Sequence, residues 1–274
     1  MITALIGALG LLGGTQATSE HSVARWSLQV EPARCVLERR NPEEGSTLSV
    51  DTTPGSDNYG VAITAGGIDA SSSLLPASLT FAPSQKVTTG LARGVKLSNN
   101  TGAVLMQGLP PSVLDDLSGT STVTIEVKKG IKTIVSVPGS TKAVEALRKC
   151  NADQLVEWGA DPAQFAPGGM MPAALKDRDS WISNGELLKL AGQSQRTSIN
   201  DDFRLLIAMD GTVAECHAMS DVTEPSLEKS ACAAVMKRRL FVPARSSSGN
   251  AVLGAATFRV SLMRHTSFVG SRPL

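Results

Sequence analysis

The stretch FRLLIAMDGTVAECHAM, residues 203–219, decides the fold of the second half of this 274-residue chain. Residues 203–209 are strongly apolar, and residues 212–219 form a second run with the composition of a strand. Asp210 and Gly211 lie between them, and Asp-Gly between two such runs is the strongest short-range signal for a β-hairpin. The stretch therefore predicts two antiparallel strands joined by a two-residue turn.

A helix and a closing strand are predicted after this hairpin. Pro225 suits a first helical turn, the acidic Glu224 and Glu228 suit the positive end of the helix dipole, and the basic residues 237–239 suit its negative end. The apolar stripe that this helix would bury consists of Leu227, Ala231, Ala234 and Val235. A Ser-rich loop over residues 246–250 leads to a last alternating strand over residues 255–263. The order predicts an antiparallel sheet with a helix on one face.

The first half of the chain is predicted to be a β-rich domain over residues 24–155. Short apolar runs alternate there with turn clusters, and residues 122–128 followed by 131–137 form the clearest hairpin. From Ser140 or Thr141 the spacing becomes helical up to Cys150, and a second helical piece covers residues 153–158. Residues 156–178 are rich in Pro and Gly and are predicted to link this domain to a second one over residues 179–264. The chain is therefore assigned to the α+β class.

The N-terminal segment indicates export. Residues 2–12 are apolar and uncharged, and a small-residue stretch follows up to Ala17. This pattern is typical of a secretory signal peptide over residues 1–17, although a buried hairpin or helix is the alternative. Eleven apolar residues are fewer than the roughly 20 that a membrane helix needs, so no stable membrane span is expected after processing. The predicted location is the periplasm or cell envelope.

The four cysteines fit an oxidising compartment. An even count indicates two disulfides with three possible connectivities. Cys35 and Cys150 bracket the first half, whereas Cys216 and Cys232 lie close together near the end. Pairing within each half would close one long loop and one short loop, and Cys150 on the inner face of a helix could reach Cys35 on an early strand.

The second half resembles the C-terminal domain of the energy transducer TonB family. The matching residues are the strand that ends in Met-Asp-Gly-Thr (209–212), the acidic-led helix, the block RRLFVPA (238–244), the closing strand, and Trp181-Ile182 near the start. The resemblance implies a TonB-like fold in which the strand with Cys216 packs under the helix with Cys232, a suitable position for a disulfide. It covers about a third of the chain.

The resemblance also implies a mode of binding. Domains of this family add a strand of an outer-membrane transporter to the edge of their sheet, so we expect binding to a protein or peptide of the cell envelope, such as an outer-membrane transporter. The residues predicted to form the binding edge are Ala255, Thr257, Phe258, Val260 and Leu262. A short linker and a cleavable signal do not suit force transmission. We therefore expect a binding role without coupling to a motor, and a role as a motor-coupled energy transducer is the alternative. A homodimer formed through the same edge is a second alternative.

No enzymatic chemistry is predicted. Asp51-Thr52-Thr53 lacks the glycine of an aspartic-protease motif, and no nucleophile-elbow, zinc-protease or phosphate-loop pattern occurs. His217 and Cys216 are adjacent on a strand and would point to opposite faces. The three histidines are scattered, so no metal site or cofactor is expected, and the formal net charge of +1 gives no general attraction to nucleic acid.

Overall fold

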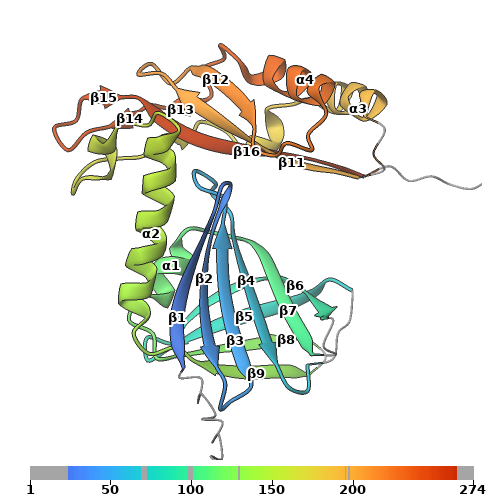
Figure 1. Ribbon diagram of the computed structural model, residues 1–274, viewed down its shortest axis with the longest axis vertical. Helices are drawn as coiled ribbons and strands as arrows, with labels where there is room; N and C mark the ends of the chain where they lie inside the picture. Colours follow the sequence, from blue (N-terminus) through green and yellow to red (C-terminus); the bar gives the residue numbers. More distant parts are fainter. Residues whose placement is uncertain are drawn as a thin grey trace, which may run out of the picture.

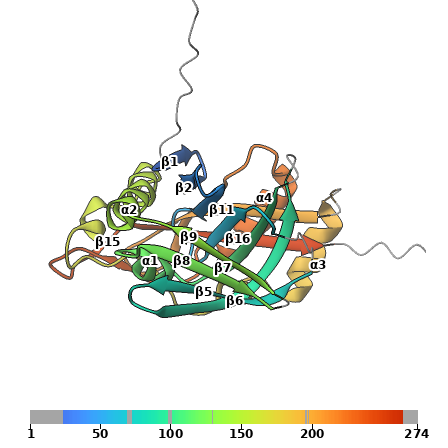
Figure 2. The ribbon, with the colours of Figure 1, turned by 90° about the horizontal axis from the view of Figure 1, so that it is seen from below.

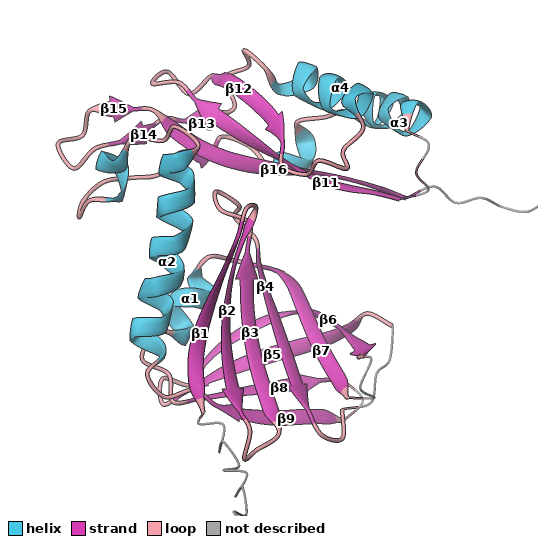
Figure 3. Cartoon of the chain, viewed as in Figure 1, coloured by secondary structure: helices cyan, strands magenta, loops and turns pink. Residues whose placement is uncertain are grey.

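A computed structural model describes residues 24–68, 73–97, 101–128, 130–194, 196 and 198–263. The predicted signal peptide, residues 1–17, and residue 264 at the end of the predicted second domain lie outside these residues. The fold is α+β, with antiparallel sheets and few helices (Figures 1 and 3). Among the described residues, no helix is long and apolar enough to cross a membrane.

One large sheet dominates the first half. Its elements are β1 (Arg25–Glu31), β2 (Arg34–Asn41), β3 (Ser46–Thr52), β4 (Tyr59–Ala65), β5 (Leu75–Ala82), β6 (Lys86–Lys96), β7 (Gly102–Leu109), α1 (Ser112–Leu117), β8 (Thr122–Val127), β9 (Ile131–Ser136) and α2 (Ser140–Glu157). The nine strands are ordered β1-β2-β3-β4-β7-β6-β5-β8-β9, and every pair is antiparallel. The predicted hairpin of residues 122–128 and 131–137 is present as β8 and β9.

The sheet curls on itself, so that β9 returns toward β1 and β2 (Figures 1 and 2). The Asn41 side-chain amide donates a hydrogen bond to the carbonyl of Ser136 at 2.8 Å, and the Trp26 indole donates one to the carbonyl of Pro138 at 2.8 Å. The curl encloses a core of alternating strand residues such as Leu37, which is 1% exposed. This core is closed by α1 and α2.

Helix α2 is one continuous helix, so the prediction of two helical pieces was wrong. Cys150 lies on its buried side and forms a disulfide with Cys35 of β2, with the two Cα atoms 6.3 Å apart. The predicted cap Ser140 is instead buried in the first turn, where its hydroxyl donates to the carbonyl of Thr120. Both views place α2 beside β1 and β2, and its far end reaches the second sheet (Figures 1 and 2).

The segment predicted as a linker, residues 156–178, contains regular structure. It contains η1 (Pro162–Phe165), the two-residue strand β10 (Ala173–Ala174) and η2 (Arg178–Ser180). Strand β10 pairs with β13, so the later part of this segment packs with the second half of the chain. The Pro and Gly content alone could not reveal this pairing, because it depends on a strand almost 70 residues further along the chain.

The second half contains a three-stranded sheet in the order β12-β11-β16. Its elements are α3 (Asn184–Gln193), β11 (Ser198–Ile207), β12 (Val213–Ala218), α4 (Pro225–Val235), β13 (Phe241–Val242), β14 (Ala244–Arg245), β15 (Ala251–Val252) and β16 (Gly254–Met263). The predicted hairpin, helix and closing strand are β11–β12, α4 and β16, whereas α3 and the β14–β15 pair were not predicted. The Asp-Gly turn is also longer than expected, because β11 ends at Ile207 and β12 begins at Val213.

Helices α3 and α4 cover the face of this sheet that points away from the first half (Figure 3). Phe203 and Phe258 stack across β11 and β16 with their ring centroids 5.1 Å apart. Trp181 meets Phe241 edge to face at 5.1 Å. The predicted stripe of α4 is buried in the same cluster, with Ala234 only partly covered. Aromatic packing of this kind adds to the apolar area that the sheet buries.

Candidate functional site

Strand β16 lies at an edge of the three-stranded sheet, with β11 on one side. In an antiparallel pair, alternate residues direct their backbone N–H and C=O groups away from the neighbouring strand. The backbone amide of Thr257 donates a hydrogen bond to Gly55 rather than to β11, so Thr257 and every second residue from it direct their backbone groups away from β11. The outward groups of β16 therefore belong to Ala255, Thr257, Arg259, Ser261 and Met263.

The first part of this edge is covered within the chain. The Thr257 amide donates to the carbonyl of Gly55 at 3.2 Å, and the Thr257 carbonyl accepts a hydrogen bond from the guanidinium of Arg178. Just before β16, the carbonyl of Leu253 accepts from the Asp161 amide at 2.9 Å and from the Gln164 side chain at 3.1 Å. Leu253 and Thr257 on this part of the edge thus already have partners within the chain.

The side chains of the predicted binding residues are also largely covered. Phe258, Val260 and Leu262 pack into the core beneath α3 and α4. Ala255 and Thr257 point to the opposite face, where they are 1% and 2% exposed, and Ala255 packs against the end of α2. Because four of these side chains are buried and Leu262 is partly buried, an added strand would contact mainly the backbone of β16.

The second part of the edge is open among the residues that the structure describes. No hydrogen bond to another part of the chain takes the outward groups of Arg259 or Ser261. Both side chains on this stretch are exposed or half-exposed, and Arg259 makes a bidentate pair with Asp202 on β11, with both N–O distances at 2.8 Å. Polar and charged side chains on an edge strand oppose uncontrolled edge-to-edge pairing while leaving its backbone accessible.

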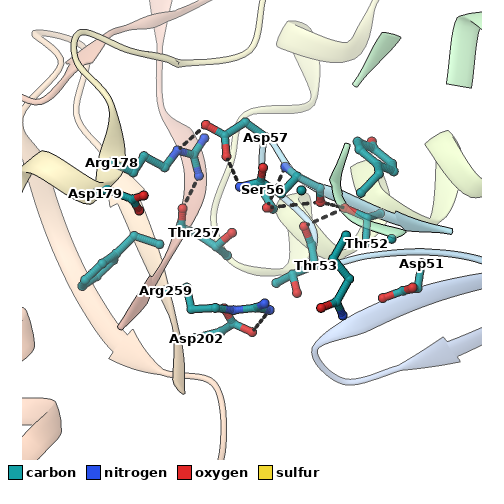
Figure 4. A pocket seen from close by; sticks show the side chains of 16 residues that line it. Asp51, Thr52, Thr53, Ser56, Asp57, Arg178, Asp179, Asp202, Thr257 and Arg259 are labelled. Carbon is teal, nitrogen blue, oxygen red and sulfur yellow. Dashed lines mark hydrogen bonds and ion pairs between the residues drawn. The ribbon is translucent and has the colours of Figure 1, made fainter. Parts of the chain in front are cut away.

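A small polar pocket adjoins this edge, between the β3–β4 region of the first half and β16 of the second (Figure 4). Its volume is about 110 Å³, below the roughly 300 Å³ at which drug-sized ligand sites begin, so it has room for waters or one side chain. Carboxylates outnumber guanidinium groups in its lining; the charged lining residues are Asp51, Asp57, Asp179, Asp202, Arg178 and Arg259. The lining therefore favours a positive charge.

Asp51 and Asp179 are the two lining carboxylates without a direct ion pair among the described residues, and Asp51 is the one whose pKa is raised. Burial raises its pKa, and the charges of Arg34 and Arg259 partly oppose that shift. Gly60 on the neighbouring strand makes room for it, because a Cβ at Gly60 would lie 2.4 Å from a carboxylate oxygen of Asp51. Such a distance is far inside van der Waals contact, so the position of Asp51 depends on this glycine.

Arg178 connects the two halves of the chain across the pocket (Figure 4). Its guanidinium donates to the Gly55 carbonyl at 2.9 Å and pairs with the Asp57 carboxylate at 3.2 Å, both in the first half. The same group donates to Thr257 and lies 5.9 Å from the ring of Trp181 in the second half. Burial lowers the pKa of Arg178, and the Asp57 charge acts in the opposite direction.

The opposite edge of the sheet, β12, is engaged by α4 and the segment after it. The Ala218 amide donates to the Glu228 carboxylate at 2.9 Å, and Val213 exchanges two backbone hydrogen bonds with residues 237 and 238. Cys216 of β12 is linked to Cys232 of α4, with a Cα–Cα distance of 5.5 Å. The four cysteines therefore form the two within-half disulfides, and no described cysteine is a free thiol.

Sequence analysis missed Gly55 and Arg178. Gly55 lies in one of the turn clusters of the first half and Arg178 in the predicted linker, and neither position carries a signal that it contacts a strand near residue 257. The described residues also contain no group of three or more His, Cys, Asp or Glu side chains placed to hold a metal ion.

Comparison with known proteins leaves this chain without an assigned family. No protein-family model, no curated protein and no solved structure matches it.

Proposed function

We propose that this chain is an exported binding protein, not an enzyme, whose TonB-like second half takes up an extended segment of a cell-envelope protein by β-strand addition. The binding surface is the outer edge of β16 from Arg259 to Met263. The observation that carries this proposal is the row of outward backbone groups at Arg259 and Ser261 that no described residue pairs. The two disulfides are compatible with the oxidising compartment that the proposal requires.

The length and position of the open edge limit the partner. Five strand residues span about 17 Å, and alternate outward groups would exchange hydrogen bonds with a partner of similar length. Each backbone hydrogen bond contributes about 1 kcal/mol net to binding, and the entropy lost on association offsets part of this free energy. We therefore expect weak binding for a minimal strand, with a Kd of roughly 10 µM to 1 mM.

The neighbouring pocket favours a partner segment with a positively charged side chain. A strand that runs along β16 toward Thr257 reaches the pocket, whose lining carries more carboxylates than guanidinium groups. Asp51 has no ion-pair partner among the salt bridges of the structure that involve described residues. A lysine or arginine near the leading end of the bound segment would meet this charge. The preferred partner is therefore an extended segment with a basic side chain.

A backbone-directed variant tests the proposal. Ser261→Pro removes the outward amide of residue 261 without removing a hydrogen bond to β11, and proline is tolerated on strand edges in this orientation. Ser261→Ala keeps the amide and is the matched control. The probe is a capped five-residue peptide of alternating Thr and Val with one terminal Lys, titrated into the ¹⁵N-labelled full chain.

The expected result is a set of amide shifts confined to β16 and its neighbours. The shifts should be present in the wild type and in Ser261→Ala and should be weakened at least tenfold in Ser261→Pro. Equal binding to both variants, or shifts located elsewhere, would contradict strand addition at this edge. Self-association of the wild type through β16, seen as a concentration-dependent mass with no response to peptide, would favour the homodimer instead.

A further inference from the structure

The contact between Gly55 and Thr257 has the form of one residue of an added strand. The Gly55 carbonyl accepts from the outward amide of Thr257, and the Arg178 guanidinium donates to the outward carbonyl of the same residue. A partner strand would supply the same two groups, one C=O and one N–H, from a single residue. The β3–β4 loop and Arg178 together therefore occupy one position of the β16 ladder.

Glycine is required at position 55 for this approach. Gly55 has a φ of +75°, and a Cβ there would lie 2.8 Å from the Cα of Ala256. A side chain would thus both strain the backbone and push the loop away from β16. The loop reaches the strand as bare backbone, which is how two strands approach each other.

The attachment of this loop is local. The Arg178 side chain holds the loop against β16, because its guanidinium contacts Gly55 and Asp57 of the loop and Thr257 of the strand. The apolar contact nearby is a small cluster of Leu155, Ala160 and Ala255, with partly buried neighbours. Each disulfide lies within one half of the chain, so neither one fastens the loop to β16.

We infer that the Gly55 loop is a releasable internal occupant of the binding edge, and that a long partner segment displaces it from Thr257. This inference rests on the proposed function and deepens it. A short segment pairs with the open part from Arg259 to Met263 and leaves the loop in place. A longer segment continues the ladder through Thr257 toward Ala255, so it competes with Gly55 and Arg178.

The competition has a quantitative consequence. When a binding-competent state is only a fraction of the molecules, the apparent Kd rises by the inverse of that fraction. The short segment binds both states and is insensitive to the loop. The long segment binds the open state, so any change that releases the loop must tighten its binding.

Arg178→Ala is the test, with two peptides as probes. One is the five-residue Thr/Val peptide with a terminal Lys, and the other extends it by four alternating residues at the end that faces Thr257. Arg245→Ala is the matched control, because that guanidinium is exposed and bonds locally to the Gly249 carbonyl. Asp57→Asn is a milder second variant that removes the charge partner of Arg178 on a side chain that is 48% exposed.

For Arg178→Ala, binding of the nine-residue peptide should tighten at least tenfold while binding of the five-residue peptide changes less than twofold. Asp57→Asn should act in the same direction with a smaller change, and Arg245→Ala should leave both affinities unchanged. Independently of any peptide, exchange of the Thr257 amide with solvent should accelerate at least tenfold in Arg178→Ala.

Three outcomes separate the two proposals. If the five-residue peptide binds but the nine-residue peptide gains nothing from Arg178→Ala or Asp57→Asn, the releasable loop is wrong and strand addition stands. If neither peptide binds any form, strand addition is wrong. Unchanged exchange of the Thr257 amide in both variants would overturn the inference whether or not a peptide binds.

Discussion

Removal of the disulfide between Cys35 and Cys150 should destabilise the first half of the chain more than removal of the other bridge destabilises the second half. The first bridge spans 115 residues and the second 16. Loop entropy in the unfolded chain grows with the logarithm of loop length, which gives about 5 kcal/mol for the long loop and about 3 kcal/mol for the short one. The expected difference is therefore about 2 kcal/mol.

The measurement must separate the bridge from the packing of its side chains. Cys35 is fully buried and Cys150 is 6% exposed, so the double variant Cys35→Ala/Cys150→Ala also loses buried contacts. Comparison of oxidised with reduced wild type gives the effect of the bridges alone, and comparison of the reduced wild type with the Ala variant gives the packing loss. The variant Cys216→Ala/Cys232→Ala lacks the other bridge and is the matched comparison.

Urea titration combined with hydrogen-exchange mass spectrometry gives a free energy for each half. Peptides from β3 report on the large sheet and peptides from β11 report on the small one. In Cys35→Ala/Cys150→Ala the loss should appear in β3, with β11 affected by less than about 1 kcal/mol. An equal loss in both peptides would refute the idea of two independently fastened halves, and a larger loss from the short bridge would refute the loop-length argument.

Three further changes have defined outcomes. Gly60→Ala should lower the free energy of unfolding by about 1–3 kcal/mol, because its Cβ would meet Asp51, whereas Gly66→Ala, with nothing within 4 Å, should be near neutral in urea titration. The fold raises the pKa of Asp51, so above pH 3.8 the native state keeps a proton that the unfolded state has lost. The free energy of unfolding should therefore fall as pH rises from 3.8 through the raised pKa. Asp51→Asn should abolish that component of a pH–stability profile. Arg238→Ala should lower the melting temperature by several degrees, since its guanidinium donates to the carbonyls of Trp181 and Ala234 at 2.7 and 2.6 Å, and Arg239→Ala is the control expected to have less effect in a thermal scan.

The elements that sequence analysis found are those whose apolar side chains point inward. Strand β8 alternates buried Val123, Ile125 and Val127 with more exposed residues, and the stripe of α4 follows helical spacing. Strand β6 reverses this relation, because Val87 and Leu91 are 57% and 53% exposed while Thr88 and Ala92 face the core. The apolar run predicted at residues 95–97 therefore indicates only the end of this strand.

Strand β2 was missed for a related reason. Its buried positions include Arg39 and Asn41, and the Arg39 guanidinium donates to the Asn41 side-chain oxygen at 3.1 Å. Buried polar groups become acceptable once they are hydrogen-bonded, but the partner is visible only in three dimensions. Helix α1 has six residues, too few to establish a helical period.

The candidate site, too, was predicted only in part from the sequence. The closing strand was found from its alternating run and its resemblance to a known family, and the structure places it at an edge of the sheet. The cover on half of that edge includes Gly55, about 200 residues earlier in the chain, together with Asp161, Gln164 and Arg178. The alternating run also does not show how far each side chain is buried, because α3 and α4 cover one face of β16 and the end of α2 covers Ala255 on the other, whereas Arg259 and Ser261 on that face are exposed.

A covered edge also has a protective interpretation, since proteins cover sheet edges and place charges on them to prevent aggregation. The two interpretations differ in what release of the loop would do. If Gly55 and Arg178 serve only as protection, Arg178→Ala should form dimers or larger species as concentration rises, because the freed ladder of Thr257 pairs with another copy. If they hold a place for a partner, Arg259 on the open stretch and its ion-pair partner Asp202 on β11 still oppose self-pairing. Arg178→Ala should then remain monomeric and bind the longer peptide more tightly. Sedimentation of Arg178→Ala over a hundredfold range of concentration, with and without the nine-residue peptide, therefore decides which role the covered edge has.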